Sequence, residues 1–193
     1  MASLRERNRL NAMRLTQRRA LDLFEERGFD QVTVSELAAE VGMAASTIYR
    51  HFETKEAIVI WDEHEPALVA ALEEAFERLP PLAAMRSAFV TALGDRYEED
   101  LEFQLRRVRF IYRAEALHAA AVEADYHDRE ELTAALAALL STKDREAAPL
   151  LAGAALLAVD VAIDRWQQLD GVEPLGPLID AAFDRIGNLD AIR

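Results

Sequence analysis

The stretch TVSELAAEVGMAASTIYRHF, residues 33–52, constrains the fold more than any other part of the chain. It opens with Thr33 and has Glu36 three positions later, which is the pattern of a capping box at the start of a helix. Gly42 follows the apolar end of that helix, and glycine adopts a left-handed turn without strain. The pattern predicts two short helices, about 34–41 and 45–52, joined by a tight turn.

The positions at which two such helices would cross and pack carry small and branched side chains. Ala38 allows a close crossing of the two helices, and Ile48 points back into the core from the second helix. Leu37, Val41 and Phe52 complete the apolar face. The spacing is that of a helix-turn-helix, whose second helix lies in the major groove of DNA. This packing leaves an outward set on the second helix: Ala45, Ser46, Thr47, Tyr49, Arg50 and His51.

The rest of the chain also favours helix, because glycine and proline are few and alternating apolar patterns are scarce. Ser3 with Glu6 predicts the start of a first helix, Gly28 its end, and Thr54 the cap of a fourth helix. Pro66 should interrupt that fourth helix before about residue 78, and LPPL (79–82) marks a boundary. Further helices are expected at about 83–96, 99–113, 115–140, 145–169 and 177–187. We therefore expect an all-α fold of about nine helices.

Composition narrows the kind of protein. The 193 residues contain no cysteine, no uncharged apolar run of membrane-spanning length, and no apolar signal segment behind the basic N-terminus. We expect a cytoplasmic protein without a membrane partner. The net charge of −13 is unevenly distributed, because residues 1–20 hold six arginines and one acidic residue. A basic arm on an acidic body suits contact with phosphates, although a solvated arginine-rich tail would look the same.

Residues that could hold DNA phosphates lie at the ends of these helices. Thr33 begins the second helix and Lys55 begins the fourth, and helix N-termini present free N–H groups to phosphates. Tyr49 and His51 lie between them in the sequence. These four residues are the expected phosphate contacts.

The segment RRALDLFEERGFDQVTVSELAAEVGMAASTIYRHFETKEAIV resembles the N-terminal DNA-binding region of the TetR family of bacterial transcriptional regulators. The resemblance covers roughly residues 5–60, and the remaining helices are similar to the family's C-terminal domain in length and order. It implies a helix-turn-helix domain at 1–55 and a helical ligand-binding and dimerisation domain at 56–193. The body is also similar to regulators of the mycofactocin-cluster type, and that similarity adds a long-chain acyl-CoA, or another apolar or anionic molecule, as a candidate effector.

The resemblance assigns roles on the DNA side. It implies phosphate contacts for Thr33, Tyr49, His51 and Lys55, an N-terminal arm formed by Arg5, Arg7 and Arg9, and positions near base edges for Ala45, Ser46, Thr47 and Arg50. The sequence departs from the family at Ala44, where a serine or threonine usually caps the reading helix. Alanine there forfeits about 1 kcal/mol of capping, which leaves the start of that helix open.

Two C-terminal apolar stripes are candidates for dimerisation. Residues 145–169 and 177–187 would form a four-helix bundle with the same helices of a second copy, or they would pack inside one chain. The family resemblance favours the dimer. The residues expected at that interface are Ala155, Val159, Ala162, Leu178, Ala182 and Phe183.

The effector pocket is expected after residue 56. Its candidate residues are Trp61, Phe89, Phe103, Arg107, Phe110, Tyr126 and Trp166. Aromatic residues on helices are more often core than ligand contacts. Arg107 points nearly opposite to Arg106, Arg109 and Arg113, and it would hold an anion or, as the better interpretation, pair with a local acidic side chain.

No cofactor, metal site or catalytic residue is expected. DEHE (62–65) lies on consecutive helical positions that do not converge on one ion, and no nucleophile–base pattern or glycine-rich phosphate loop is present. The resemblance to the TetR family implies a homodimeric repressor that binds a palindromic operator and is released by a small molecule. Activation or ligand-independent regulation is the alternative, followed by a small-molecule enzyme and by a helical adaptor without DNA affinity.

Overall fold

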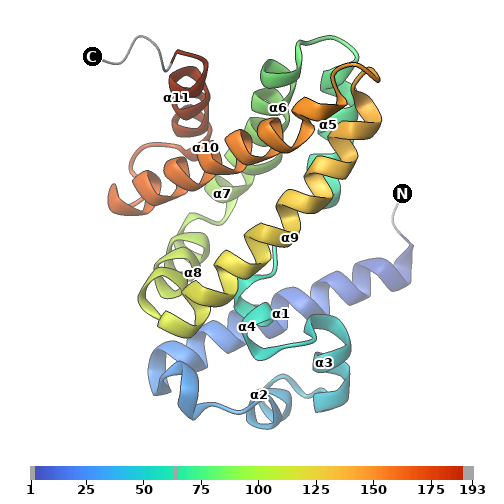
Figure 1. Cartoon of the computed structure of the whole chain (residues 1–193). Coiled ribbons are helices and arrows are strands. Elements are labelled where there is room, and N and C mark those ends of the chain that lie inside the picture. The colour runs from blue at the N-terminus through green and yellow to red at the C-terminus, as the bar shows by residue number, and fades with distance from the viewer. Residues whose placement is uncertain (1–2, 63–64, 189–193) are drawn as a thin grey trace. The chain divides into compact units, whose positions relative to one another are not determined.

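The computed structural model describes residues 3–62 and 65–188, and this part of the chain contains helices and no strand (Figure 1). Eleven α-helices are present in the described part, together with two 3₁₀ turns and one π-helical turn, η2. The fold is all-α, as the sequence predicts. The elements are α1 (Leu4–Arg27), η1 (Phe29–Gln31), α2 (Val34–Val41), α3 (Ala45–Phe52), α4 (Lys55–Ile60), α5 (Glu65–Phe76), α6 (Pro81–Phe89), η2 (Val90–Gly94), α7 (Asp95–Glu99), α8 (Leu101–Arg113), α9 (Glu115–Leu139), η3 (Arg145–Ala147), α10 (Ala148–Gln168) and α11 (Leu175–Gly187).

The first helix begins and ends where the sequence predicts. The hydroxyl oxygen of Ser3 accepts a hydrogen bond from the Glu6 amide at 3.2 Å, which caps the first turn of α1. At the other end Gly28 has φ 89°, a conformation that glycine adopts without strain, and its amide donates to the Phe24 carbonyl. The start and end of α1 are therefore set by its own terminal residues.

The break that Pro66 predicts in the fourth helix is also present. Thr54 caps α4 by accepting a hydrogen bond from the Ala57 amide at 3.0 Å, and α4 ends at Ile60. The next helix, α5, begins at Glu65, one residue before Pro66. A proline is tolerated in the first turn of a helix but not in its interior, so the long helix is divided at this point.

The chain folds into two compact units, and the first is not a continuous segment. It comprises Met1–Glu63 together with Arg106–Val122, that is, the end of α8 and the beginning of α9. Its core includes Phe24, Leu37, Ile48 and Ile58 from the N-terminal helices and Leu117 from α9. Leu117 is fully buried there, so the hydrophobic core of the N-terminal helices extends beyond the consecutive segment 1–55 expected as a domain.

The second unit comprises His64–Leu105 and Glu123–Arg193. Within it α10 packs along α11, and α5 packs against α6. The segment expected as a single helix at 83–96 is divided by η2. Gly94 at the end of η2 approaches Gly176 of α11 so closely that a Cβ on Gly94 would lie 3.2 Å from the Gly176 Cα. A side chain on Gly94 would therefore require a small shift of its neighbour, whereas a Cβ on Gly176 would lie 3.6 Å from the Gly94 Cα, an ordinary contact distance.

One ion-pair cluster joins helices within the second unit. Arg86 of α6 donates to the Asp180 carboxylate at 2.6 Å and also to Asp184, both on α11. By length and composition alone, the segment Arg145–Gln168 would qualify as a membrane span in the described part of the chain. Core helices meet the same criteria, and this segment contributes Ala152, Ala155 and Trp166 to the core.

Candidate nucleic-acid interface

The turn between α2 and α3 has the geometry that the sequence predicts. Thr33 accepts a hydrogen bond from the Glu36 amide, and the Glu36 carboxylate accepts one from the Thr33 amide at 2.8 Å, which completes the capping box. Gly42 ends α2 in the left-handed region at φ 68° and ψ 31°. The Met43 amide then donates to the Ala38 carbonyl at 2.9 Å. The bend is thus held by backbone hydrogen bonds at its centre.

The buried face of this helix pair fixes which side of α3 is exposed. Ala38, Ile48 and Phe52 are almost completely buried, and α1 packs against α2 while α3 packs against α4. On the opposite side Tyr49 is 50 % exposed, and Ser46 and Arg50 are exposed. The predicted outward set divides accordingly, because Ala45, Thr47 and His51 are half-buried. The exposed side of α3 offers a hydroxyl, a phenol and a guanidinium to a partner.

The reading helix begins at Ala45 without a side-chain cap. Ala44 occupies the N-cap position with φ −74° and ψ 140°, and it makes no capping hydrogen bond. Its carbonyl accepts from the Thr47 amide at 2.9 Å and from the Ile48 amide at 3.3 Å. The start of α3 is therefore at the expected place, while its first N–H groups lack the side-chain acceptor that a serine would supply.

The two predicted helix-end contacts, Thr33 and Lys55, are already engaged within the chain. The Thr33 hydroxyl donates to the Glu36 carboxylate at 2.8 Å. The Lys55 ammonium donates to the Phe29 carbonyl and lies 4.1 Å from the centroid of the Phe29 ring. A phosphate that binds Lys55 must approach η1 or draw the ammonium away from Phe29.

A basic environment surrounds His51. Its Nδ1 atom is buried and has no hydrogen-bond partner among the described residues. Burial lowers the pKa of His51, and the nearby charges of Arg50 and Arg9 lower it further. This places Arg9 of α1 close to α3. Arg5 and Arg7 are exposed on the first turns of α1, so the expected arm is helical from Leu4 onward.

One ion pair and one buried glutamine, neither of them expected from the sequence, hold the helices of the first unit together. Arg27 at the end of α1 pairs with Glu36 at 2.7 Å. This pair, followed by the hydrogen bonds from Thr33, lowers the pKa of Glu36 to about 2. Gln17 is buried in α1 and donates to the Val59 and Trp61 carbonyls at 3.2 and 2.7 Å. A polar residue on the apolar face of α1 was the only sequence signal for Gln17.

The candidate effector residues divide between the two units. Trp61, Arg107 and Phe110 belong to the first unit, where Trp61 packs edge-on against Phe52 at 5.8 Å and Phe110 stacks on Phe24 at 6.4 Å. Arg107 is 4 % exposed; it donates to the Ile60 and Trp61 carbonyls and to the Asp62 carboxylate, each at 3.1–3.2 Å. It is therefore paired with a local acidic side chain and the end of α4.

Phe89, Phe103, Tyr126 and Trp166 belong to the second unit. Phe89 and Phe103 are buried, and Phe89 packs against Phe183 at 6.3 Å. Trp166 is completely buried against Tyr97 at 5.4 Å, and its indole N–H has no hydrogen-bond partner in the described residues. Tyr126 lies at the surface, beside the guanidinium of Arg129 at 4.9 Å. The set thus combines buried positions with one exposed position.

The dimerisation candidates lie mostly among the buried residues of the chain. Ala155, Val159, Ala162, Ala182 and Phe183 are buried inside the chain, and Leu178 is half-buried. The five buried side chains lie on α10 and α11, which pack together within one protomer. Their part in a dimer interface therefore stays a prediction, and side chains on the exposed side of the same helix are the more accessible candidates. The metal candidate DEHE includes His64, which lies outside the described residues.

A tight turn joins α2 to α3, and the apolar face of α3 is buried while its polar face is exposed. This arrangement defines a helix-turn-helix DNA-binding protein with a helical C-terminal region. The model described as "Bacterial regulatory proteins, tetR family" matches residues 18–60, and that of the "MftR C-terminal domain" matches residues 79–189. These matches cover more than half of the chain, which therefore belongs to the tetR family and carries an MftR-type C-terminal domain. Family membership makes it a transcriptional regulator and not an enzyme.

Curated relatives agree with this assignment. The chain is 27% identical over 171 residues to the "Putative mycofactocin biosynthesis transcriptional regulator MftR" of Mycobacterium tuberculosis, covering 87% of this chain and 85% of that protein. It is 30% identical over 135 residues to the "HTH-type transcriptional regulator TcmR" of Streptomyces glaucescens. That second match covers 66% of this chain and 58% of the length of TcmR.

Solved structures share the fold. FadR of Thermus thermophilus, a TetR family repressor in complex with lauroyl-CoA, has a TM-score of 0.54 at 20% identity, covering 94% of this chain and 96% of that one. The fatty acid degradation regulator FadR of Bacillus halodurans has a TM-score of 0.57 at 18% identity, covering 92% and 98%. At these identities the likeness concerns the fold alone.

Proposed function

We propose that the protein is a ligand-responsive repressor that binds a palindromic operator as a homodimer and leaves it when a small molecule binds. The observation that carries this proposal is the α2–α3 turn, which buries Ile48 and Phe52 and leaves Ser46, Tyr49 and Arg50 exposed on α3. A helix presented in this way fits the major groove. The protein acts in the cytoplasm, where its operator DNA is found, without a membrane partner.

Some residues of α3 contact base edges of the DNA, and others contact its phosphates. Arg50 has the planar guanidinium that reads guanine through two hydrogen bonds, and Ser46 and Thr47 supply hydroxyl groups of short reach. Tyr49, His51, Thr33 and Lys55 contact phosphates. Arg5, Arg7 and Arg9 extend the basic surface along α1. The whole chain has a net charge of −13. Its acidic remainder repels DNA, so nonspecific DNA contact is confined to the basic surface of α1 and α3.

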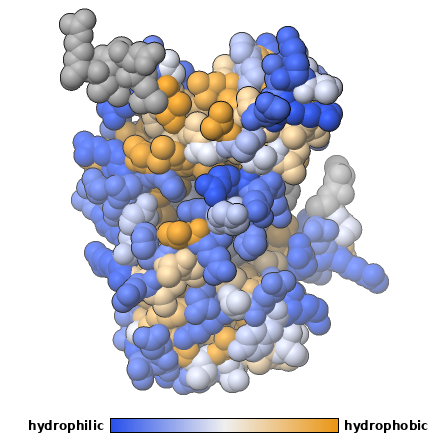
Figure 2. Space-filling view, viewed as in Figure 1, coloured by the Kyte–Doolittle hydropathy of each residue, from blue (hydrophilic) through white to orange (hydrophobic). Residues whose placement is uncertain are grey.

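A second copy of the chain covers the exposed apolar side of α10. Leu150, Leu157 and Val161 are 75 %, 59 % and 49 % exposed, and their spacing of seven and four residues places them on one side of the helix. Apolar side chains also gather at the surface in the region of α10 and α11 in Figure 2. Contiguous exposed apolar surface of this kind marks an interface. A twofold interface here pairs two reading heads for two operator half-sites.

The effector binds in the second unit near Trp166. The buried indole N–H of Trp166 lacks an acceptor among the described residues, and an unsatisfied buried donor is costly. A carbonyl or anionic oxygen of a ligand would satisfy it, with Phe89 and Phe103 providing apolar contacts. The lauroyl-CoA complex of the Thermus protein supports a long-chain acyl-CoA as the ligand class.

This function is tested by selecting, from a pool of random DNA duplexes, those that the 193-residue protein binds. We expect an enriched palindrome whose half-sites lie about one helical turn apart. Affinity for that palindrome should fall steeply with salt, because each neutralised phosphate releases counterions. Enrichment of no sequence, or affinity independent of salt, would leave a helical adaptor as the better description. Addition of lauroyl-CoA should then weaken binding to the selected palindrome.

A further inference from the structure

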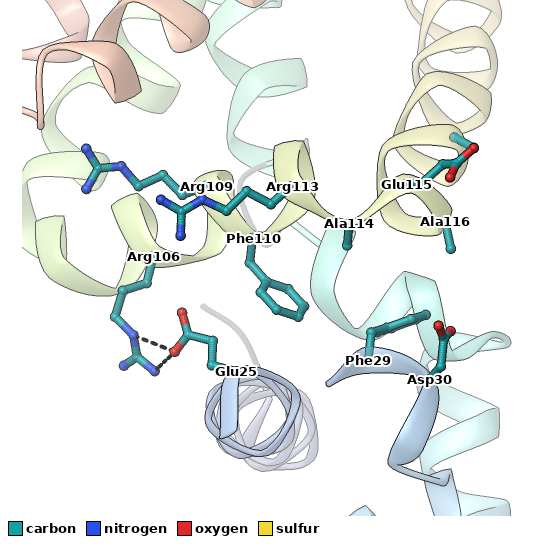
Figure 3. Close-up of a pocket in the computed structure, with 11 residues that line it drawn as sticks. Glu25, Phe29, Asp30, Arg106, Arg109, Phe110, Arg113, Ala114, Glu115 and Ala116 are labelled. Carbon is teal, nitrogen blue, oxygen red and sulfur yellow. Dashed lines mark hydrogen bonds and ion pairs between the residues drawn. The ribbon is translucent and has the colours of Figure 1, made fainter. Parts of the chain in front are cut away.

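The first unit contains an open pocket that the DNA-binding surface does not use. Its volume is about 920 Å³, and its lining comes from the end of α1, η1, α8 and the beginning of α9. The residues that line it are Glu25, Phe29, Asp30, Arg106, Arg109, Phe110, Arg113, Ala114, Glu115, Ala116 and Ala119 (Figure 3). All of them belong to the first unit.

One wall of the pocket is basic and is held in place. Arg106 forms ion pairs with Glu25 and with Asp22, the latter at 2.7 Å, and these carboxylates raise its pKa. Arg106 is thus neutralised by α1. Arg109 and Arg113 continue the same side of α8 one turn and two turns further on. Arg113 is exposed and forms no ion pair within the described part of the chain.

The floor of the pocket is aromatic. Phe110 and Phe29 are half-buried, and both pack against Phe24, at 6.4 and 5.0 Å between ring centroids. The Lys55 ammonium lies 4.1 Å from the centroid of the Phe29 ring. Because these contacts hold the two rings in place, the rings offer a rigid apolar surface on which a flat ligand ring can lie.

The far side of the pocket carries acceptors. In Figure 3 the guanidinium groups of Arg109 and Arg113 lie on one side, Asp30 and Glu115 lie on the other, and Phe110 and Phe29 lie between them. A simple anion would meet both the arginines and the two carboxylates. A ligand with an anionic end and a donor-bearing end matches both sides.

We infer that this pocket binds a phosphorylated nucleoside. Arginine is the side chain best suited to phosphate oxygens, so the phosphates lie at Arg113 and Arg109. The base lies on Phe110 and Phe29, and ribose hydroxyl or base amino groups donate to Asp30 and Glu115. The volume is within the range of about 300–1,000 Å³ typical of small-molecule sites. This site is separate from the effector site near Trp166 and does not rest on DNA binding.

Calorimetric titration of the full-length protein with ADP, adenosine and inorganic phosphate tests the inference in EDTA-containing buffer. We expect one ADP bound per chain, with adenosine and phosphate each weaker by about tenfold or more, since each lacks one half of the recognition. The assignment is overturned if ADP does not bind, or if phosphate alone or adenosine alone binds as well as ADP.

Matched variants locate the site. Arg113→Gln should weaken ADP by about tenfold or more, while Arg165→Gln, which removes an exposed arginine from α10, should leave ADP affinity unchanged. Ala119→Glu places a carboxylate in the pocket and should abolish binding, whereas Ala134→Glu on the exposed side of α9 should not. Unchanged ADP affinity in either pocket variant, with the folded state verified by circular dichroism, would place the nucleotide elsewhere. Operator affinity, measured separately, reports on the DNA-binding function.

Discussion

The ammonium of Lys55 lies 4.1 Å above the centroid of the Phe29 ring and donates a hydrogen bond to the carbonyl of the same residue. This pair joins the first turn of α4 to η1, and Phe29 packs in turn against Phe24. Lys55 therefore has a structural partner in the protein without DNA. Its expected role at a phosphate must compete with that partner.

Substituting Lys55→Met should affect both stability and DNA binding. Loss of the charge removes the hydrogen bond and the cation–π contact, at a cost of about 1–2 kcal/mol in the free energy of unfolding. One fewer phosphate contact should reduce the slope of log affinity against log salt by about one. Urea denaturation and salt-dependent operator titration measure the two effects. A lower stability with an unchanged salt slope would make Lys55 a purely structural residue.

Arg50→Ala and Tyr49→Ala should differ in kind. Arg50 is assigned to a base edge, so its loss should relax the preference at one operator position by about 1–3 kcal/mol. Tyr49 is assigned to the backbone, so its loss should weaken binding evenly across sequences without unfolding the protein. Sequence profiles of both variants, selected from random duplexes, separate the two roles. Identical profiles would show that the division between base and phosphate contacts is incorrect.

Ala44→Ser should strengthen the start of the reading helix. The serine hydroxyl supplies the missing acceptor at the N-cap of α3, which is worth about 0.5–2 kcal/mol of stability. Operator affinity should rise if the first turn of α3 forms fully only on DNA. Thermal unfolding and operator titration are compared with Ala39→Ser, an exposed position inside α2 where serine gains no such bond. Equal effects at both positions would argue against a capping deficit.

Asp160→Asn should change the pH dependence of stability. Partial desolvation of its carboxyl group, and then the charge of Asp125, raise the pKa of Asp160 to about 6 from 3.8. A raised carboxyl pKa means that the folded state binds the proton more tightly, so its stability falls as pH rises from about 4 to about 6.

Above about pH 6, Asp160 is ionised in the folded protein and lowers its stability, whereas a neutral asparagine does not. Asp160→Asn should therefore be more stable than the native protein at pH 7, and the difference should vanish below about pH 4. Asp160 as a whole is exposed at the surface, so solvent screens much of the effect. Urea denaturation across this pH range measures it. The control is Glu173→Gln, in the loop before α11, and a parallel response of both variants would mean that Asp160 has no special environment.

Leu157→Glu should weaken the dimer. A charge on the exposed apolar side of α10 would be buried without a partner in the proposed interface, so the dimer should weaken by roughly tenfold or more. Sedimentation velocity measures the oligomeric state, and titration of the palindrome should show a parallel loss of affinity. Val172→Glu, at a highly exposed position between α10 and α11, serves as the control. A dimeric Leu157→Glu variant would place the interface on another face.

Local sequence patterns were sufficient wherever a residue acts on its own backbone. Thr33 with Glu36, Gly42 and Thr54 end or begin helices through groups within a few residues of themselves. The class of the protein could be predicted for the same reason, because the helix-turn-helix is a local motif. The absence of a cap at Ala44 was visible in the sequence, and its consequence is present in the structure.

Tertiary packing decided what these patterns leave open. Periodicity shows that Ala155 and Ala162 share a side of a helix, and the fold buries that side within the chain. Arg107 could have held a ligand, but it closes the end of α4 and pairs with Asp62. The pocket beside Phe110 brings together residues from four elements. Its composition depends on contacts between distant segments, and sequence spacing carries no information about which distant surface a helix face will meet.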